Sequence, residues 1–255
     1  MGQQLQHDGR TIAYEVSGDG PPLVLLHGIT ESSRAWDPVL EHLSGQRRVV
    51  AVDLRGHGGS DPGPDHDLEG MADDVAAVVD HLGIAAPDVV GHSLGGIVAA
   101  VLGARHPVRR VVVVDQPLAL AGFKEALAPV EEMLRGEAFP AVIGQMFDGF
   151  SAPLPVAEQE RLAGLRRPEQ QVVLDVWSPV FERSVEELDV LVRGMLDGLD
   201  VPVLALHAEE PGPEYRAWLG DVVPGAELEV WPGGGHYPHL ADPARFAERV
   251  LAFGA

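Results

Sequence analysis

The chain of 255 residues carries a formal net charge of −21 at pH 7 and contains no cysteine. The charge excludes nucleic acid and anionic membrane surfaces as expected partners, because both are polyanionic. The missing cysteines exclude disulfides, thiolate metal sites and a cysteine nucleophile. No run of about 18 apolar residues could form a transmembrane helix. The first ten residues lack the basic and apolar regions of a secretory signal, so we expect a cytoplasmic protein.

Apolar runs alternate with helix-like segments along most of the chain. Residues 5–16 read as a hairpin around a turn at 7–10. Continuous apolar runs then predict strands buried on both faces, at 23–26, 48–53, 87–90, 111–115, 201–206 and 228–231. Between or after them, helices are expected near 32–44, from 71 to 82, over 96–104 and over about 242–253. This alternation predicts an α/β fold with a mostly parallel sheet covered by helices on both faces.

Residues 117–198 interrupt this pattern. They contain no strand-like apolar run, but four segments have apolar residues at helical spacing. We therefore divide the chain into a core domain, residues 1–116 and 199–255, and a helical subdomain, residues 117–198. Most of the apolar side chains in this subdomain are expected to form its own core. A few are expected to line an apolar pocket for an acyl group.

The segment Gly91-His92-Ser93-Leu94-Gly95 lies between a predicted buried strand and an apolar helix. A Gly-x-Ser-x-Gly sequence in that context is typical of a nucleophile elbow, a sharp turn that exposes the serine hydroxyl. Small residues two before and two after the serine let strand and helix approach closely. Ser93 is therefore the candidate nucleophile.

A serine hydroxyl needs a general base and donors for the oxyanion that forms during acyl transfer. Among the 11 histidines, His236 lies on a glycine-rich loop after the last predicted strand, where a base could reach the elbow. His239 shares this loop but is expected to pack near the final helix. The side chain of His92 is expected to turn away from the nucleophile. The backbone N–H groups of Ile29 and Leu94 are the candidate oxyanion donors.

These motifs together resemble the α/β-hydrolase family over essentially the whole chain. The resemblance rests on Leu-Leu-His-Gly at 25–28, Asp-Leu-Arg-Gly-His-Gly at 53–58, the elbow at 91–95, and Gly-His-Tyr-Pro-His at 235–239. It implies an eight-stranded, mostly parallel twisted sheet with Ser93 as nucleophile and His236 as base. It also implies that residues 117–198 form a lid between the sixth and seventh strands. The turn at 53–58 is expected to be structural.

The acid of the expected catalytic triad departs from the usual family pattern. Relatives commonly place an aspartate after the seventh strand, but here the matching position is proline in the segment His207–Pro213. Asp115, at the end of the sixth strand, is the preferred candidate, and Glu210 is the alternative. Both preserve the order serine, acid, histidine along the chain. A dyad without an acid is a third possibility.

The leading functional hypothesis is a serine hydrolase that cleaves a small or medium hydrophobic carboxylic ester, lactone or thioester through an acyl-enzyme. The expected partner is a small-molecule substrate, with no cofactor and no metal. The oligomeric state is left open. Two alternatives use the same fold, because fold does not determine function. One is a ligand-binding receptor; the other is a non-hydrolytic cyclase or lyase, or a hydrolase of carbon–carbon bonds.

Overall fold

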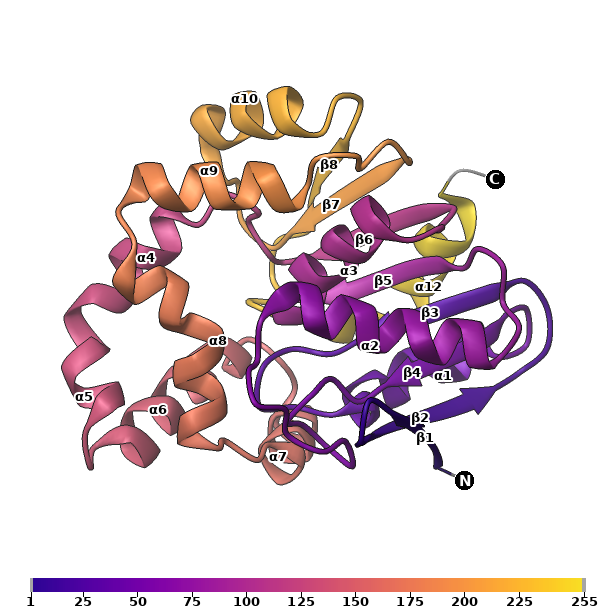
Figure 1. The fold of residues 1–255 in the computed structure, drawn as a ribbon, viewed down its shortest axis with the longest axis horizontal. Helices are drawn as coiled ribbons and strands as arrows, with labels where there is room; N and C mark the ends of the chain where they lie inside the picture. Colours follow the sequence, from indigo (N-terminus) through magenta and orange to yellow (C-terminus); the bar gives the residue numbers. More distant parts are fainter. Residues whose placement is uncertain (1, 254–255) are drawn as a thin grey trace.

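The computed structural model describes residues 2–253, and its centre is a twisted sheet of eight strands in the order β1-β2-β4-β3-β5-β6-β7-β8. The first two strands form the predicted antiparallel hairpin, and β2 also pairs antiparallel with β4. All other neighbours pair in parallel (Figure 1). The strands are β1 (Gln3–His7), β2 (Arg10–Ser17), β3 (Pro22–Leu26), β4 (Arg48–Val52), β5 (Asp88–His92), β6 (Arg110–Val114), β7 (Val203–His207) and β8 (Glu227–Val230).

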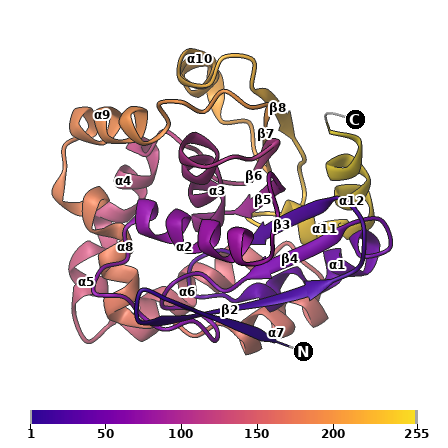
Figure 2. The ribbon, with the colours of Figure 1, turned by 45° about the vertical axis from the view of Figure 1, so that its right-hand side comes forward.

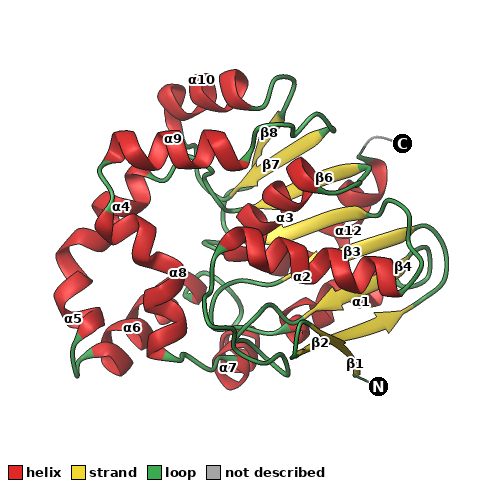
Figure 3. Ribbon diagram, viewed as in Figure 1, coloured by secondary structure: helices red, strands yellow, loops and turns green. Residues whose placement is uncertain are grey.

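Alternate residues of the central strands supply two separate apolar cores, one on each face of the sheet. Val24 and Leu26 of β3 pack on one face with helices α2 (Leu68–His81), α3 (Leu94–Arg105) and α10 (Gly212–Val222). Leu23 and Leu25 pack on the other face with α1 (Asp37–Leu43) and α12 (Pro243–Ala252). Figure 3 shows α2 and α3 in front of the sheet, with α1 and α12 behind it. The predicted α/β architecture is thereby confirmed.

Several helices differ from the sequence prediction. The segment expected as one helix near 32–44 begins with a 3-10 turn at Ser33–Trp36 and becomes α-helical only at Asp37. Helix α10 was not predicted, because it begins with Gly212 and Pro213 and buries only Tyr215 and Leu219. Its amphipathic signal is therefore weak. The short helix α11 (Pro238–Ala241) precedes α12.

Between β6 and β7 the chain forms six α-helices and a short 3-10 turn, which together we call the insert (residues 121–195). Figures 1 and 2 show it beside the sheet, with α9 above α4 and α7 below the sheet's edge. No helix within residues 2–253 has the length and apolar character needed to cross a membrane. The helices of the insert are α4 (Ala121–Leu127), α5 (Glu131–Arg135), α6 (Phe139–Ser151), α7 (Val156–Leu165), α8 (Gln170–Glu182) and α9 (Val185–Met195).

Candidate active site

The candidate reactive residues follow the carboxyl ends of the parallel strands. Ser93 comes directly after β5, Asp115 directly after β6, and His236 lies in the loop after β8. Strands β5 and β6 are adjacent, and their last residues, His92 and Val114, are register partners. Sheet topology alone therefore brings Ser93 and Asp115 to one edge, the edge at which open α/β sheets bind ligands.

Ser93 occupies a sharp turn between β5 and α3. Its φ of 50° and ψ of −122° lie outside the regions that L-residues prefer. The Ser93 N–H donates to the carbonyl oxygen of Val114 at 3.0 Å, which holds the turn against β6. A side chain on Gly91 would collide with the Gly95 carbonyl, and one on Gly95 would collide with the Leu26 carbonyl. The close approach of strand and helix thus requires glycine at both positions.

Backbone strain is concentrated at this edge of the sheet. Within residues 2–253, four non-glycine residues have a positive φ, and three of them are Thr30, Ser93 and Asp115, which follow β3, β5 and β6. Such conformations cost roughly 1–3 kcal/mol each and persist only where surrounding contacts enforce them. This clustering marks the edge as a candidate functional site.

His236 and Asp115 form a direct side-chain contact. The His236 Nδ1 lies 2.7 Å from Oδ2 of Asp115, and the other carboxylate oxygen accepts the Ala208 N–H at 2.7 Å. Burial favours the neutral acid, but the hydrogen bond and charge of His236 outweigh it and hold the pKa of Asp115 below its ordinary value. The ionised Asp115 accepts a hydrogen bond from the Nδ1–H group, so the proton of the neutral imidazole is on Nδ1 and Nε2 of His236 is unprotonated.

Burial also governs the ionisation of His236. It lowers the pKa of the imidazole below its ordinary value, although Asp115 acts in the opposite direction. His236 is therefore neutral near pH 7, as a general base must be. No hydrogen bond joins Ser93 to His236 among residues 2–253. Such a contact is often long without substrate and tightens when the substrate binds.

Glu210, the alternative acid, lies away from His236. Its two carboxylate oxygens each accept a hydrogen bond at 2.7 Å from the guanidinium of Arg216. Both partners are exposed, on the loop and first turns around α10. The structure thus brings one of the two candidate acids, Asp115, to the imidazole and leaves the other in a surface ion pair.

The candidate oxyanion donors also lie at this edge. Ile29 belongs to the loop after β3, and Leu94 is the first residue of α3. Neither backbone N–H donates a hydrogen bond to another group in the described part of the chain. A buried N–H without a partner is uncommon, so both are available to an oxygen of a bound molecule.

Two neighbouring histidines behave differently from one another. His239 packs against Phe246 of α12, as expected from the sequence, with tilted rings whose centroids are 5.7 Å apart. The His92 side chain has no hydrogen bond to Ser93 within residues 2–253; its ring lies 4.7 Å from the His236 ring, and its Nε2 donates to the His236 carbonyl at 2.8 Å. His92 therefore supports the loop that carries His236.

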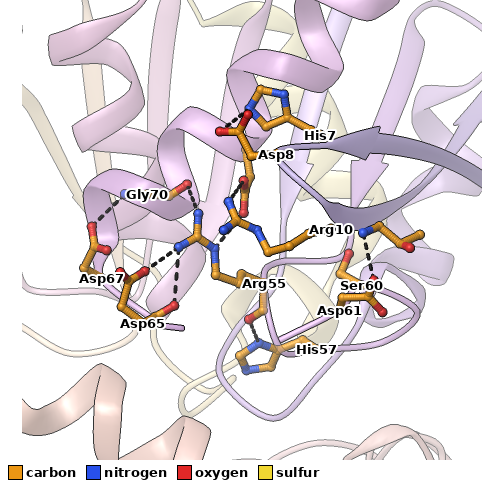
Figure 4. A network of polar contacts seen from close by, with 12 residues as sticks. His7, Asp8, Arg10, Arg55, His57, Ser60, Asp61, Asp65, Asp67 and Gly70 are labelled. Carbon is orange, nitrogen blue, oxygen red and sulfur yellow. Dashed lines mark hydrogen bonds and ion pairs between the residues drawn. The ribbon is translucent and has the colours of Figure 1, made fainter. Parts of the chain in front are cut away.

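The turn at 53–58 is held by structural contacts. Asp53 accepts the backbone N–H groups of Ser33 and Gly59. Figure 4 shows the guanidinium of Arg55 between Asp65 and the carbonyl of Gly70, at 2.7 and 2.8 Å. Arg55 also donates to the buried Asp74 at 2.8 Å. These contacts join the turn to the N-terminal end of α2.

The expectation of a separate core for the insert was wrong: Leu134, Ile143 and Trp177 are buried, but they belong to the same apolar cluster as Val24 and Leu26 of β3. Phe150 is different: it is partly exposed, and its ring lies 4.9 Å from the His236 ring. A separate cavity of about 340 Å³ lies between α8, α9 and the loop before α2. Its lining includes neither Ser93 nor His236, so we place the reactive groups outside it. Within residues 2–253, no group of three acidic or histidine side chains is arranged to hold a metal ion.

Residues 23–249 match the model of the alpha/beta hydrolase family. The chain is 31% identical to a bifunctional esterase/perhydrolase of Acinetobacter calcoaceticus over 99% of both chains. It is 32% identical to a non-heme haloperoxidase of Rhodococcus erythropolis over 90% of both. The solved structure of an esterase from Rhodococcus sp. ECU1013 superimposes with a TM-score of 0.76, at 29% identity, over 99% of this chain and 98% of that one. By its fold, its motifs and these relatives, the chain belongs to the alpha/beta hydrolase family.

Proposed function

We propose that this protein is a serine hydrolase that cleaves a small or medium hydrophobic carboxylic ester, lactone or thioester. The single observation that carries the proposal is the hydrogen bond of 2.7 Å between His236 and Asp115, next to a serine on a strained elbow. A neutral imidazole oriented by a carboxylate is the arrangement that activates a serine hydroxyl. The esterase names of similar proteins support the same reaction class.

In the proposed mechanism, Ser93 Oγ attacks the carbonyl carbon while its proton moves to Nε2 of His236. The developing oxyanion accepts hydrogen bonds from the backbone N–H groups of Ile29 and Leu94. Asp115 stabilises the imidazolium that forms and keeps its orientation. The imidazolium then donates its proton to the departing alcohol or thiol, which leaves an acyl group on Ser93. A water molecule, deprotonated by His236, attacks this acyl group and releases the acid.

We further propose that residues 117–198 act as a lid on a core formed by residues 1–116 and 199–255. Support comes from the run of helices between β6 and β7 and from Phe150, whose ring adjoins His236. An aromatic side chain at this point offers apolar surface to a substrate. The proposed partner is therefore a hydrophobic small molecule, and the charge of −21 disfavours polyanionic substrates.

The decisive experiment treats the protein with a fluorophosphonate and locates the adduct by intact-mass and peptide-mass analysis. We expect one stoichiometric adduct on Ser93, absent from the Ser93→Ala variant. The reagent reports an activated serine without any assumption about the substrate. A protein that forms no adduct at neutral pH would contradict the proposal and favour a ligand receptor or a non-hydrolytic enzyme on this scaffold.

A second activity, perhydrolysis, is favoured by the names of two relatives, a bifunctional esterase/perhydrolase and a non-heme haloperoxidase. Hydrogen peroxide would replace water as the attacking group, so that the acyl-enzyme yields a peracid and free Ser93. The test measures peracid formation from acetate and hydrogen peroxide, which gives peracetic acid and water. Ser93→Ala must abolish the reaction if it proceeds at this site.

A further inference from the structure

Glu31 is a buried carboxylate in the loop that carries the proposed oxyanion donor Ile29. Its side chain is 1% exposed. One oxygen accepts the Gly28 N–H at 3.2 Å and lies 3.8 Å from Nδ1 of His92. The other oxygen accepts a hydrogen bond of 2.7 Å from the hydroxyl group of Tyr237. Glu31 thus contacts the loop after β3, the last residue of β5 and the residue after His236.

Tyr237 continues this chain of contacts into the insert. Its hydroxyl oxygen accepts a hydrogen bond of 3.1 Å from Arg166, which follows α7. The Arg166 side chain is 8% exposed, and its guanidinium lies 4.9 Å from the ring centre of Phe147 on α6. Glu31, Tyr237 and Arg166 therefore form a continuous buried sequence of donors and acceptors, from the oxyanion loop to the insert.

The same region of the insert contacts the two loops through backbone groups. The Arg167 N–H donates to the Thr30 carbonyl at 2.8 Å, directly beside Ile29. The Phe150 carbonyl accepts the His236 N–H at 3.3 Å. This part of the insert is therefore bonded to the loop that bears the proposed donor and to the loop that bears the proposed base.

The buried charges of Glu31 and Arg166 depend on these contacts. A buried carboxylate and a buried guanidinium are each costly unless they are compensated, and here Tyr237 bridges them. Burial alone would raise the pKa of Glu31, but its contacts with His92 and Tyr237 outweigh burial and hold that pKa well below its ordinary value. Glu31 is thus an anion at neutral pH. Loss of Arg166 or of the Tyr237 hydroxyl leaves its buried negative charge with fewer groups to balance it.

We propose that Glu31, Tyr237 and Arg166 are positioning residues through which the insert holds the Gly28–Glu31 loop in place. The catalytic consequence rests on the proposed function, because only an acyl-transfer enzyme needs the Ile29 N–H as an oxyanion donor. For such an enzyme, docking of α6 and α7 sets the geometry of the oxyanion site. The insert then holds the oxyanion donor in position, in addition to covering the site.

The test compares Arg166→Gln with Arg135→Gln. Both substitutions remove one guanidinium from the insert, and Arg135 also lies 4.9 Å over an aromatic ring, that of Phe181. However, Arg135 is half-exposed and pairs with Glu131 on α5, away from the loop. Amide hydrogen exchange of peptides covering residues 27–31 is measured for both variants and for the unaltered protein. We expect at least tenfold faster exchange in Arg166→Gln and no change in Arg135→Gln.

Kinetics on p-nitrophenyl butyrate supply the second measurement. A misplaced oxyanion donor stabilises the transition state less, whereas it affects the binding of the substrate little. We therefore expect kcat to fall about tenfold to a hundredfold with KM nearly unchanged. Tyr237→Phe deletes a single oxygen and should likewise lower kcat and leave KM nearly unchanged. If Arg166→Gln fails to fold, Tyr237→Phe carries both measurements. The double variant should be little worse than either single variant, because both break one chain of contacts.

The outcomes distinguish this inference from the proposed function. Unchanged exchange at residues 27–31 in both Arg166→Gln and Tyr237→Phe would overturn the inference, whatever the activity. Faster exchange in a protein that forms no fluorophosphonate adduct would retain the structural coupling and refute the hydrolase. Equal losses of kcat in Arg166→Gln and Arg135→Gln would indicate a general effect of removing a positive charge. That outcome would also overturn the inference.

Discussion

The imidazole of His236 and the carboxylate of Asp115 lie 2.7 Å apart although 121 positions separate them in the sequence. Asp115 reaches this place from the end of β6 with a strained backbone, at φ 47°. Its second oxygen is held by the Ala208 N–H at the end of β7. Asp115 is therefore held by contacts at the ends of two strands, and its proposed role in orienting the histidine can be tested by substitution.

The first prediction concerns the proposed acid. Asp115→Asn should lower kcat/KM by roughly 10³–10⁴, because asparagine cannot stabilise the imidazolium or hold the required tautomer. Glu210→Gln is the matched control and should leave kcat/KM within about twofold, since Glu210 contacts Arg216 at the surface. Steady-state kinetics on p-nitrophenyl butyrate measure both. The reverse pattern, with loss in Glu210→Gln alone, would refute the assignment.

The second prediction is the pH dependence of activity. The proposed base must be neutral to accept the serine proton, and burial lowers the pKa of His236, opposed by Asp115 and Glu31 and supported by His92. Activity should therefore rise with pH and reach half its plateau below the ordinary histidine value of about 6.5. The measurement is kcat/KM from pH 4.5 to 8, with circular dichroism to verify folding. A midpoint above pH 6.5 would contradict the expectation that burial lowers the pKa of His236.

The third prediction tests the elbow. A Cβ on Gly95 would collide with the carbonyl oxygens of Leu26 and His27, so Gly95→Ala must displace backbone on β3 or α3. We expect loss of fluorophosphonate labelling and a destabilisation of about 1–3 kcal/mol, typical of overpacking. Gly194→Ala is the control, because nothing lies within 4 Å of its added methyl group on α9. It should label normally and gain up to about 1 kcal/mol of stability from helix propensity.

The fourth prediction separates stability from activity. Asp88 begins β5, at the end of the strand opposite Ser93, and is 4% exposed. Its carboxylate accepts hydrogen bonds from Arg47, Arg109 and Arg110. Asp88→Asn leaves these cations without their buried counter-charge and should cost about 3–5 kcal/mol.

Denaturant unfolding measures this cost for Asp88→Asn. The same change at the exposed Asp80 on α2 should stay within about 0.5 kcal/mol. Fluorophosphonate labelling of the folded Asp88→Asn protein should match that of the unaltered protein, because the ion cluster lies far along β5 from Ser93. A labelling defect at a temperature where the variant is fully folded would show coupling between the two ends of the strand.

Much of the architecture could be predicted from local sequence, because its determinants are local. A continuous apolar run such as Leu23–Leu26 is typical of a strand in the middle of a sheet that helices cover on both faces. The elbow was recognisable because the close approach of strand and helix requires glycine at 91 and 95. Helix α10 was not predicted, because its local apolar pattern is weak.

Tertiary structure alone decided which distant side chains meet. The sequence left Asp115 and Glu210 as alternative acids, because both follow strands and precede His236 in the chain. Pairing of β6 between β5 and β7 carries Asp115 to the imidazole, while Glu210 turns outward to Arg216. The contacts of Tyr237 with Glu31 and Arg166 had no sequence signal at all. A contact between residues more than a hundred positions apart depends on the arrangement of strands and helices, which no local pattern encodes.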